Sequence, residues 1–471
     1  KVILCCSVLA PLSFGELVPT IREGLGVRSD KEILFTNLSL AHYTCTQYYK
    51  STGRTINSSI AALLIIFTSR YMETSFGHLT YCTNIHAGES WKDHFEALKK
   101  FFPSIKEKIS PGNAMGIGLR LSNEASIDLL HEENLGDFKK WLHKEGAYVF
   151  TMNGFPYGGF HRTSVKDNVH TPDWTTRERV AYTIRLFDIL KALLPEGMDG
   201  GISTSPLGYR RRFSPGELKA KRETATNNIL DVVEYLIQQS AQGKTMHLDI
   251  EPEPDGILET GDEFIEWFEG ELMQAGIKRL MQKFDAGNDK AIALLKKHLC
   301  LCYDVCHFAV GYEDHEKEIN RLEEKGIRVG KIQISAALKK EMGSDSEERK
   351  NIKEAFEKFN EPVYLHQVVA KKDNGGLLRY PDLPEALDDY NNKSVVEWRA
   401  HFHVPIAADD FGLLQSTRSD IIQVLNIQKQ KRFTHHLEAE TYTWEVLPQE
   451  LKLPLQESII RELDWVKQVL S

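Results

Sequence analysis

The sequence predicts an α/β protein in which eight strands close into a (β/α)8 barrel, with insertions between strands 7 and 8. From Leu79 onward, short apolar runs alternate with amphipathic helical patterns, which is typical of parallel strands joined by helical crossovers. The number of these units favours a closed barrel over an open sheet. The 471-residue chain is long enough, because such a barrel needs about 250 residues and tolerates insertions that take it beyond 400.

The first four strands are expected at residues 79–86, 115–121, 148–152 and 200–206. The helices between and after them are expected at residues 93–109, 138–143, 175–194 and 228–239. In the third of these helices, Thr175 and Glu178 have the spacing of a capping box, and Pro195 ends the pattern. The Gly- and Pro-rich residues 153–159 predict a turn at the rim of the barrel.

The last four strands are expected at residues 246–251, 299–304, 329–335 and 435–444, with helices at 316–325, 420–428 and 457–470. A long insertion separates the seventh strand from the eighth. Within it, residues 363–370 and 377–380 flank Asp373-Asn-Gly-Gly376, which is typical of a hairpin turn. The segment Trp398–Pro405 then places His401 and His403 on one face, two residues apart.

Composition narrows the function classes. The net charge of −9 argues against a surface that binds phosphate backbones, so we expect no nucleic-acid partner. The seven cysteines lack paired C-x2-C spacing, which favours a reduced, cytoplasmic protein without a structural zinc module. No apolar run reaches the roughly 18 residues of a membrane span. Cys300 and Cys302 share one face of a strand, so we expect packing and neither a disulfide nor a zinc set.

Two domains of unequal status are expected. Residues 1–71 form an N-terminal extension of uncertain status, and the strand and helix alternation begins only after Met72. We therefore assign the barrel to residues 72–471 and expect it to fold without the preceding segment.

Six acidic or imidazole side chains lie at or just beyond predicted strand ends. They are Glu251, Asp304, His307, His401, His403 and Glu440. In a (β/α)8 barrel these ends meet at one mouth, and carboxylates and imidazoles are good ligands for a divalent metal. Two alternatives stay open: Glu438 or Glu440 could pair with a barrel lysine or arginine, and one histidine of the His-x-His pair could be a hydrogen-bonded core residue.

This pattern resembles the xylose isomerase-like TIM barrel superfamily. Its members end strand five in a metal-binding Glu, carry Asp-x-x-His after strand six and end strand eight in Glu. The matching residues here are Glu251, Asp304 with His307, and Glu440. Several stretches resemble, more narrowly, the EboE family of metabolite-traffic proteins: Tyr81–Trp91, Tyr303–His307, Lys331–Ser335, His401–Pro405 and Glu438–Trp444.

The resemblance implies one divalent metal ion (Mn, Mg, Co or Zn) held by Glu251, Asp304, His401, His403 and Glu440. It implies catalytic proton exchange by Glu251 and Glu440, and substrate contacts from His307, Gln333 and His86. Gln333 departs from the superfamily, whose isomerases have a metal-binding His on strand seven. Either His401 or His403 replaces that ligand, or the site prefers a harder ion such as Mn²⁺ or Mg²⁺.

Three functions follow as expectations. The first is a metal-dependent isomerase or epimerase that acts on a small metabolite, in metabolite processing or traffic. The second is a non-catalytic metabolite carrier, and the third is a metal-dependent hydrolase of the endonuclease IV type. The expected partners are a small-molecule metabolite and other products of the same gene cluster.

Overall fold

The computed structural model describes residues 73–161 and 164–471, and the predicted extension over residues 1–71 lies outside the described residues. Eight parallel strands form a nearly closed barrel in the order β2-β15-β8-β7-β6-β5-β4-β3. They are β2 (Gly77–Tyr81), β3 (Met115–Arg120), β4 (Ala147–Asn153), β5 (Gly200–Thr204), β6 (Met246–Ile250), β7 (Leu299–Asp304), β8 (Val329–Ile334) and β15 (His436–Ala439). The predicted (β/α)8 barrel is thus confirmed.

The first and last strands of this order, β2 and β3, are joined largely by threonine side chains. Thr80 Oγ1 donates to Gly116 O at 2.9 Å and accepts from Gly118 N at 3.0 Å. Thr83 Oγ1 accepts the backbone N–H of Arg120 at 2.8 Å, and a single bridge joins Cys82 to Gly118. These hydroxyls bond to backbone groups of β3, which would otherwise lack partners at the seam.

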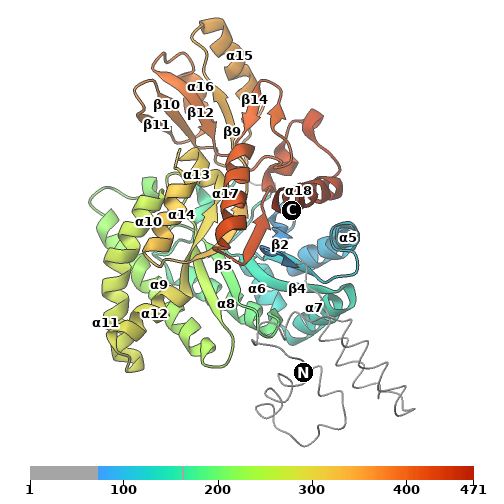
Figure 1. The fold of residues 1–471 in the computed structure, drawn as a ribbon, viewed down its shortest axis with the longest axis vertical. Coiled ribbons are helices and arrows are strands. Elements are labelled where there is room, and N and C mark those ends of the chain that lie inside the picture. The colour runs from blue at the N-terminus through green and yellow to red at the C-terminus, as the bar shows by residue number, and fades with distance from the viewer. Residues whose placement is uncertain (1–72, 162–163) are drawn as a thin grey trace, which may run out of the picture. The chain divides into compact units, whose positions relative to one another are not determined.

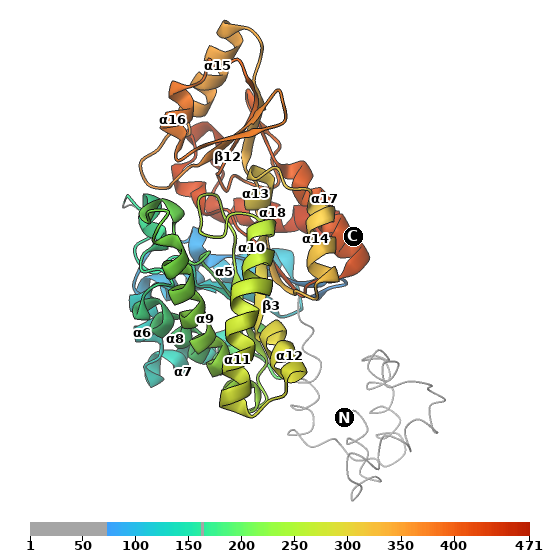
Figure 2. The same ribbon diagram turned by 90° about the vertical axis from the view of Figure 1, so that its left-hand side faces the viewer.

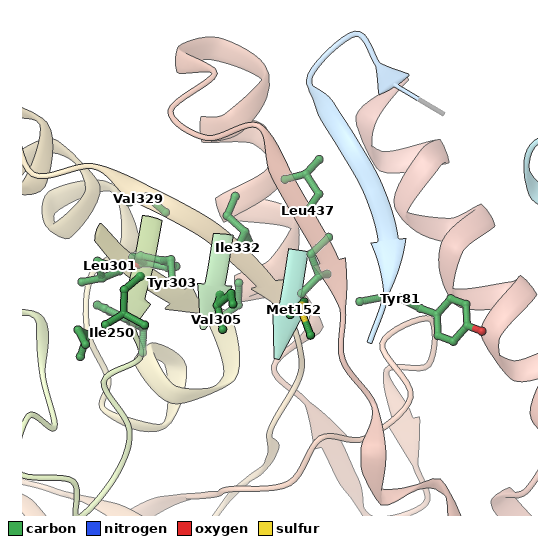
Figure 3. Packing of buried hydrophobic residues seen from close by; sticks show 14 of the residues in the cluster. Tyr81, Met152, Ile250, Leu301, Tyr303, Val305, Val329, Ile332 and Leu437 are labelled. Carbon is green, nitrogen blue, oxygen red and sulfur yellow. The ribbon is translucent and has the colours of Figure 1, made fainter. Parts of the chain in front are cut away.

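Helices surround the barrel (Figures 1 and 2). They are α5 (Trp91–Ile109), α6 (Asn123–Leu129), α7 (Glu132–Glu145), α8 (Arg177–Leu193), α9 (Leu218–Ser240), α10 (Gly261–Trp267), α11 (Met273–Phe284), α12 (Asn288–His298), α13 (Val305–Val310), α14 (His315–Glu324), α17 (Arg418–Lys431) and α18 (Leu455–Leu470). The buried core includes strand side chains such as Ile250, Leu301, Tyr303, Ile332 and Leu437 (Figure 3). None of the helices described is long and apolar enough to cross a membrane.

The interior of the barrel contains charged residues. Lys331 Nζ on β8 lies 2.5 Å from Glu438 Oε2 on β15 and 3.4 Å from Met152 O on β4, and the lysine and glutamate side chains are 0% exposed. For Glu438, the alternative to metal binding is therefore the one observed, because this glutamate pairs with a barrel lysine. On β3, a Cβ at Gly118 would lie 1.8 Å from Glu438 Oε1, so only glycine leaves room for this carboxylate.

The predicted insertion between the seventh and eighth barrel strands is confirmed as a six-stranded antiparallel sheet (Figure 1). Its order is β11 (Leu377–Tyr380), β10 (Val368–Lys372), β12 (Val395–Ala400), β9 (Leu338–Glu341), β14 (Leu414–Ser416) and β13 (Asp410–Phe411), with helices α15 (Ser346–Glu357) and α16 (Leu383–Asp388). The hairpin around Asp373-Asn-Gly-Gly376 is also confirmed, because β10 and β11 pair antiparallel on either side of it.

Some local predictions are wrong. The proposed capping box of α8 does not form, because Asp173 Oδ1 accepts the hydroxyl of Thr175 at 2.5 Å and the N-cap is Thr176, without a side-chain cap bond. The strand predicted at 363–370 begins only at Val368, since Glu361 binds the backbone N–H groups of the two residues at the start of that stretch.

The strand predicted at 435–444 is shorter than expected. It ends at Ala439, and Tyr442–Val446 forms a 3-10 helix. The first strand likewise ends at Tyr81 and is followed by a 3-10 turn over Thr83–Ile85. In both places the chain leaves the sheet early and turns across the mouth of the barrel, which brings polar residues toward the site.

Candidate metal centre

The barrel and the insertion both contribute to one polar cluster. Glu251 directly follows β6, Asp304 ends β7, and His307 lies in the first turns of α13. His401 and His403 come from the extended segment after β12, which is anchored by a bond from His401 N to Gln367 O at 2.8 Å. The structure therefore brings an inserted segment over the carboxyl ends of the barrel strands, as a rim site requires.

Three imidazoles in this cluster share the same tautomer. His307 Nδ1 lies 3.0 Å from Pro252 O, and His403 Nδ1 lies 3.2 Å from Glu440 O. His401 Nδ1 lies 2.8 Å from the amide oxygen of Gln367, whose own NH2 group is committed to a backbone carbonyl. Because each partner is an oxygen acceptor, each Nδ1 carries the proton and each Nε2 presents a lone pair.

These lone pairs converge. The Nε2 atoms of His307 and His401 are 3.1 Å apart, and those of His401 and His403 are 3.3 Å apart. Unprotonated nitrogens this close repel one another unless a cation lies between them. Two ligands bound about 2.1 Å from one ion at angles of 90–110° are separated by roughly 3.0–3.4 Å. The spacing therefore fits ligands of a single metal ion.

Carboxylates flank the three imidazoles. Asp304 Oδ1 accepts from Ser335 Oγ at 2.7 Å and from His307 N at 3.1 Å, which fixes the carboxylate. Its Oδ2 has no hydrogen-bond partner among the described residues and lies 3.9 Å from the Nε2 atoms of both His307 and His403. Glu253 Oε2, which the sequence did not single out, is 4.0 Å from His307 Nε2. These oxygens are placed to complete a coordination shell.

Glu251 and Glu440 lie in the same cluster but in different surroundings. Glu251 Oε2 has no partner among the described residues, and its Oε1 lies 3.8 Å from His307 Nδ1. Glu440 Oε1 instead accepts from Asn84 Nδ2 at 2.7 Å and from Asn153 Nδ2 at 2.8 Å. Glu440 is thus a carboxylate already held in place by two amides, whereas Glu251 keeps a free oxygen.

Electrostatics makes this cluster costly without a cation. Burial, Glu440 and Asp304 raise the pKa of Glu251 well above its usual value. Burial, Asp304 and Glu438 do the same to the pKa of Glu440. Burial and the neighbouring histidines lower the pKa of His401, and burial lowers that of His403 to about 4. His401 and His403 are therefore neutral near pH 7, which is the metal-binding form of imidazole.

A cavity of about 60 Å³ opens beside these groups. Its polar lining is Asn84, Asn153, Lys166, His170, Glu251, Glu253, Gln367, Glu440 and the three histidines 307, 401 and 403, and its aromatic lining is Phe155, Phe160, Tyr364 and Tyr442. Lys166, the one lysine or arginine in this lining, is paired with Asp382 at 2.7 Å. The cavity is thus predominantly acidic and has an aromatic wall.

Two residues expected to contact substrate lie elsewhere. His86 packs against Phe101 with ring centroids 5.1 Å apart, and its Nε2 bonds to Tyr81 OH at 3.1 Å. Gln333 is buried on β8, in register with Asp304 and Glu438, and neither atom of its amide has a hydrogen-bond partner among the described residues. Neither residue lines the cavity.

Several polar residues of the site were not expected from the sequence, among them Asn84, Asn153 and Glu253. Asn84 follows β2 and Asn153 ends β4, so the rule that rim residues cluster could have indicated both. Glu253 lies in Glu251-Pro-Glu253-Pro254, where the repeated Glu-Pro pair was the available signal.

No protein-family model matches the chain, and no curated protein matches its sequence. The narrower resemblance to the EboE family is therefore not supported, while the solved structures similar to the chain include xylose isomerase domain proteins.

One is a xylose isomerase domain protein from Planctomyces limnophilus, with 12% identity and a TM-score of 0.43 over 84% of this chain and 97% of that chain. Another is the IolI protein with a bound zinc atom, with 13% identity and a TM-score of 0.42 over 84% and 98%. A third is the probable 3-DHS dehydratase AsbF from Bacillus anthracis, with 12% identity and a TM-score of 0.38 over 82% and 97%. The assignment of the barrel rests on the strand order of the chain itself.

Proposed function

We propose that the protein binds one divalent metal ion at the barrel mouth and isomerises or epimerises a small polyhydroxylated or carbonyl compound. The observation that carries this proposal is the convergence of unprotonated Nε2 atoms on His401, whose own Nε2 lies 3.1 Å from that of His307 and 3.3 Å from that of His403. Asp304 Oδ2, which lacks a partner among the described residues, adds an anionic ligand to this set.

The donor set favours particular ions. Imidazole nitrogens suit Zn²⁺, Co²⁺ and Mn²⁺ better than Mg²⁺, which prefers oxygen. Of the two alternatives raised by Gln333, the geometry supports the one in which His401 and His403 supply the nitrogen ligands. Their Nδ1 bonds to Gln367 and to Glu440 O orient both rings, as is usual for metal-bound histidines.

The residues around the proposed ion fit proton transfer. When bound, a divalent ion would hold neighbouring substrate oxygens and increase the acidity of the adjacent C–H bond. Glu440, held by Asn84 and Asn153, would keep a fixed orientation toward a substrate in the cavity. Glu251 has an oxygen without a partner and a raised pKa, so it would exchange a proton readily.

Solvent exchange tests this proposal. The metal-loaded protein would be incubated in deuterated water with a panel of aldoses, ketoses and cyclitols, and deuterium in the recovered compounds would be measured by NMR. We expect carbon-bound deuterium with the native protein and its loss with Glu440→Gln. Glu313→Gln is the matched control, because Glu313 is a half-buried glutamate with a pKa raised to about 8 that accepts from Gly261 N outside the cavity.

The opposite result would identify another function. The isomerase proposal would be contradicted by a compound that binds the metal-loaded protein but contains no carbon-bound deuterium when it is recovered. Native protein and Glu440→Gln would then give the same result. This outcome would favour the metabolite carrier instead.

A further inference from the structure

A second group of potential ligands lies at the opposite end of the barrel. Asp199 immediately precedes β5, His247 is the second residue of β6, and His436 is the first residue of β15. These are the amino-terminal ends of the strands, whereas Glu251 follows the other end of β6. Glu251 comes four residues after His247 in the chain, which is about 13 Å at roughly 3.3 Å per residue. The group is therefore distinct from the proposed site at the mouth.

The distances in this group are those of metal ligands. His247 Nε2 lies 3.7 Å from Asp199 Oδ2, and His436 Nε2 lies 3.6 Å from Asp199 Oδ1. Both separations are too long for hydrogen bonds. Two ligands about 2.1 Å from one ion, at an angle near 120°, would be roughly 3.6 Å apart. One ring nitrogen of each imidazole and one oxygen of Asp199 all lie within 4.8 Å of one another.

Both imidazoles are buried with unused nitrogen atoms. The side chains of His247 and His436 are each 1% exposed. His247 Nε2 and both ring nitrogens of His436 have no hydrogen-bond partner among the described residues. A buried polar atom without a partner is destabilising. An ion bound between these nitrogens and Asp199 would remove most of that cost.

The surrounding strands are shaped for one of these histidines. His247 Nδ1 lies 2.5 Å from Asp249 Oδ1, the carboxylate–histidine arrangement that orients metal-bound imidazoles. A Cβ at Gly201 would lie 2.4 Å from His247 Cε1, and a Cβ at Gly330 would lie 2.0 Å from Asp249 Oδ1. Two glycines on β5 and β8 thus leave the space that this pair fills.

The charges nearby admit one competing account. Arg328 lies 3.4 Å from Asp199 Oδ2, and a protonated His247 between Asp199 and Asp249 would form a balanced ion-pair network without any metal. That network leaves His436 with neither ring nitrogen bonded. A metal ion uses His436 and Asp199 Oδ1 as well, and therefore accounts for more of the group.

We propose that Asp199, His247 and His436 bind a second divalent transition-metal ion in a structural role. Two imidazoles and one carboxylate suit Zn²⁺, Co²⁺ or Fe²⁺. The ion would connect β5 and β6 to β15, which are separated in the barrel by β7 and β8. The Asp199 side chain is 26% exposed, so an ion can reach the group from solvent.

Metal stoichiometry tests the proposal. The full chain would be stripped with a chelator, reloaded with Co²⁺ or Zn²⁺ alone, desalted and measured by elemental analysis. We expect two equivalents for the native protein and one equivalent for His436→Gln and for Asp199→Asn. His403→Gln should also keep one equivalent, by losing the ion at the mouth. His315→Gln, a buried histidine that pairs with Asp420 at 3.3 Å, should keep two.

The outcomes separate the two sites. One equivalent in native protein that is lost in His403→Gln and kept in His436→Gln and Asp199→Asn would overturn this second site and leave the mouth site intact. One equivalent in native protein that is lost in Asp199→Asn and kept in His403→Gln would overturn the site at the mouth and leave this second site intact. If His436→Gln does not fold, Asp199→Asn decides alone, because its partly exposed side chain tolerates an isosteric change.

Discussion

The buried pair Lys331–Glu438 allows a quantitative prediction. Both side chains are 0% exposed, and Lys331 Nζ lies 2.5 Å from Glu438 Oε2. Burial alone would lower the pKa of Lys331, but the Glu438 carboxylate outweighs it and raises the pKa, so the lysine stays charged. Lys331→Met removes this charge while preserving much of the side-chain volume.

The cost of this substitution follows from what Glu438 loses. Its Oε1 already has no hydrogen-bond partner among the described residues, and the close approach of Gly118 leaves no room for water on that side. Removing one partner of a buried ion pair typically costs about 3–5 kcal/mol. For a barrel of some 400 residues we extrapolate roughly 1–2 °C per kcal/mol, so the melting temperature should fall by about 3–10 °C.

A double-mutant cycle would measure the interaction energy between Lys331 and Glu438. The midpoints of urea and thermal unfolding would be compared for native protein, Lys331→Met, Glu438→Leu and the double variant. We expect each single variant to be less stable than the double variant, because two apolar side chains in place of a buried pair are often neutral or stabilising. Single variants within about 1 kcal/mol of native protein, with no recovery in the double variant, would refute this reasoning.

Three further substitutions test other parts of the structure. Burial raises the pKa of Glu462 from 4.5 to about 8, so native stability should decline as the pH rises through this window. Glu462→Gln should therefore be more stable than native protein at pH 8.5, by on the order of 5 kcal/mol, and equally stable at pH 4.5; equal stability at both pH values would refute the assignment. Replacing Cys300 and Cys302 together by Ala should leave the metal content unchanged, and a loss of metal would show that a thiol is a ligand. Gly118→Ala should destabilise the barrel by about 1–3 kcal/mol, because the new Cβ would lie 1.8 Å from Glu438 Oε1; an unchanged urea midpoint would contradict the packing.

The barrel could be predicted because its pattern is repeated. Eight apolar strands separated by amphipathic helices leave few alternative topologies. The exact ends of the strands could not be predicted, because they depend on contacts between residues that are distant in the sequence. The loss of the Thr175 capping box to Asp173 and the early end of β15 at Ala439 both arise in this way.

The sequence predicted several residues that belong to the site but did not predict the role of each one. Strand-end position indicated Glu251, Asp304 and Glu440. It did not indicate that two amides hold Glu440, or that His307 presents Nε2 to His401. Those features depend on side-chain orientation and on the placement of the inserted segment, which have no periodic signature in the sequence.

The amino-terminal group was missed for a related reason. His247 and His436 lie within strands whose pattern indicates only a core, and Asp199 lies in the loop just before β5. Nothing in their spacing along the chain relates them. Only closure of the barrel brings β5, β6 and β15 close enough for the three side chains to meet.

The most direct test of the proposed metal centre compares native protein with Asp304→Asn. Asparagine keeps the oxygen that accepts from Ser335 and from His307 N, and replaces only the Oδ2 that faces the imidazoles. Bound metal and melting temperature would be measured for both proteins, with and without chelator.

We expect Asp304→Asn to hold one ion fewer and to melt below native protein when metal is present, since binding to the folded state stabilises it. In chelator the variant should be at least as stable, because a repulsive charge has been removed. Native protein that binds no divalent ion, with a melting temperature that chelator leaves unchanged, would contradict the metal centre.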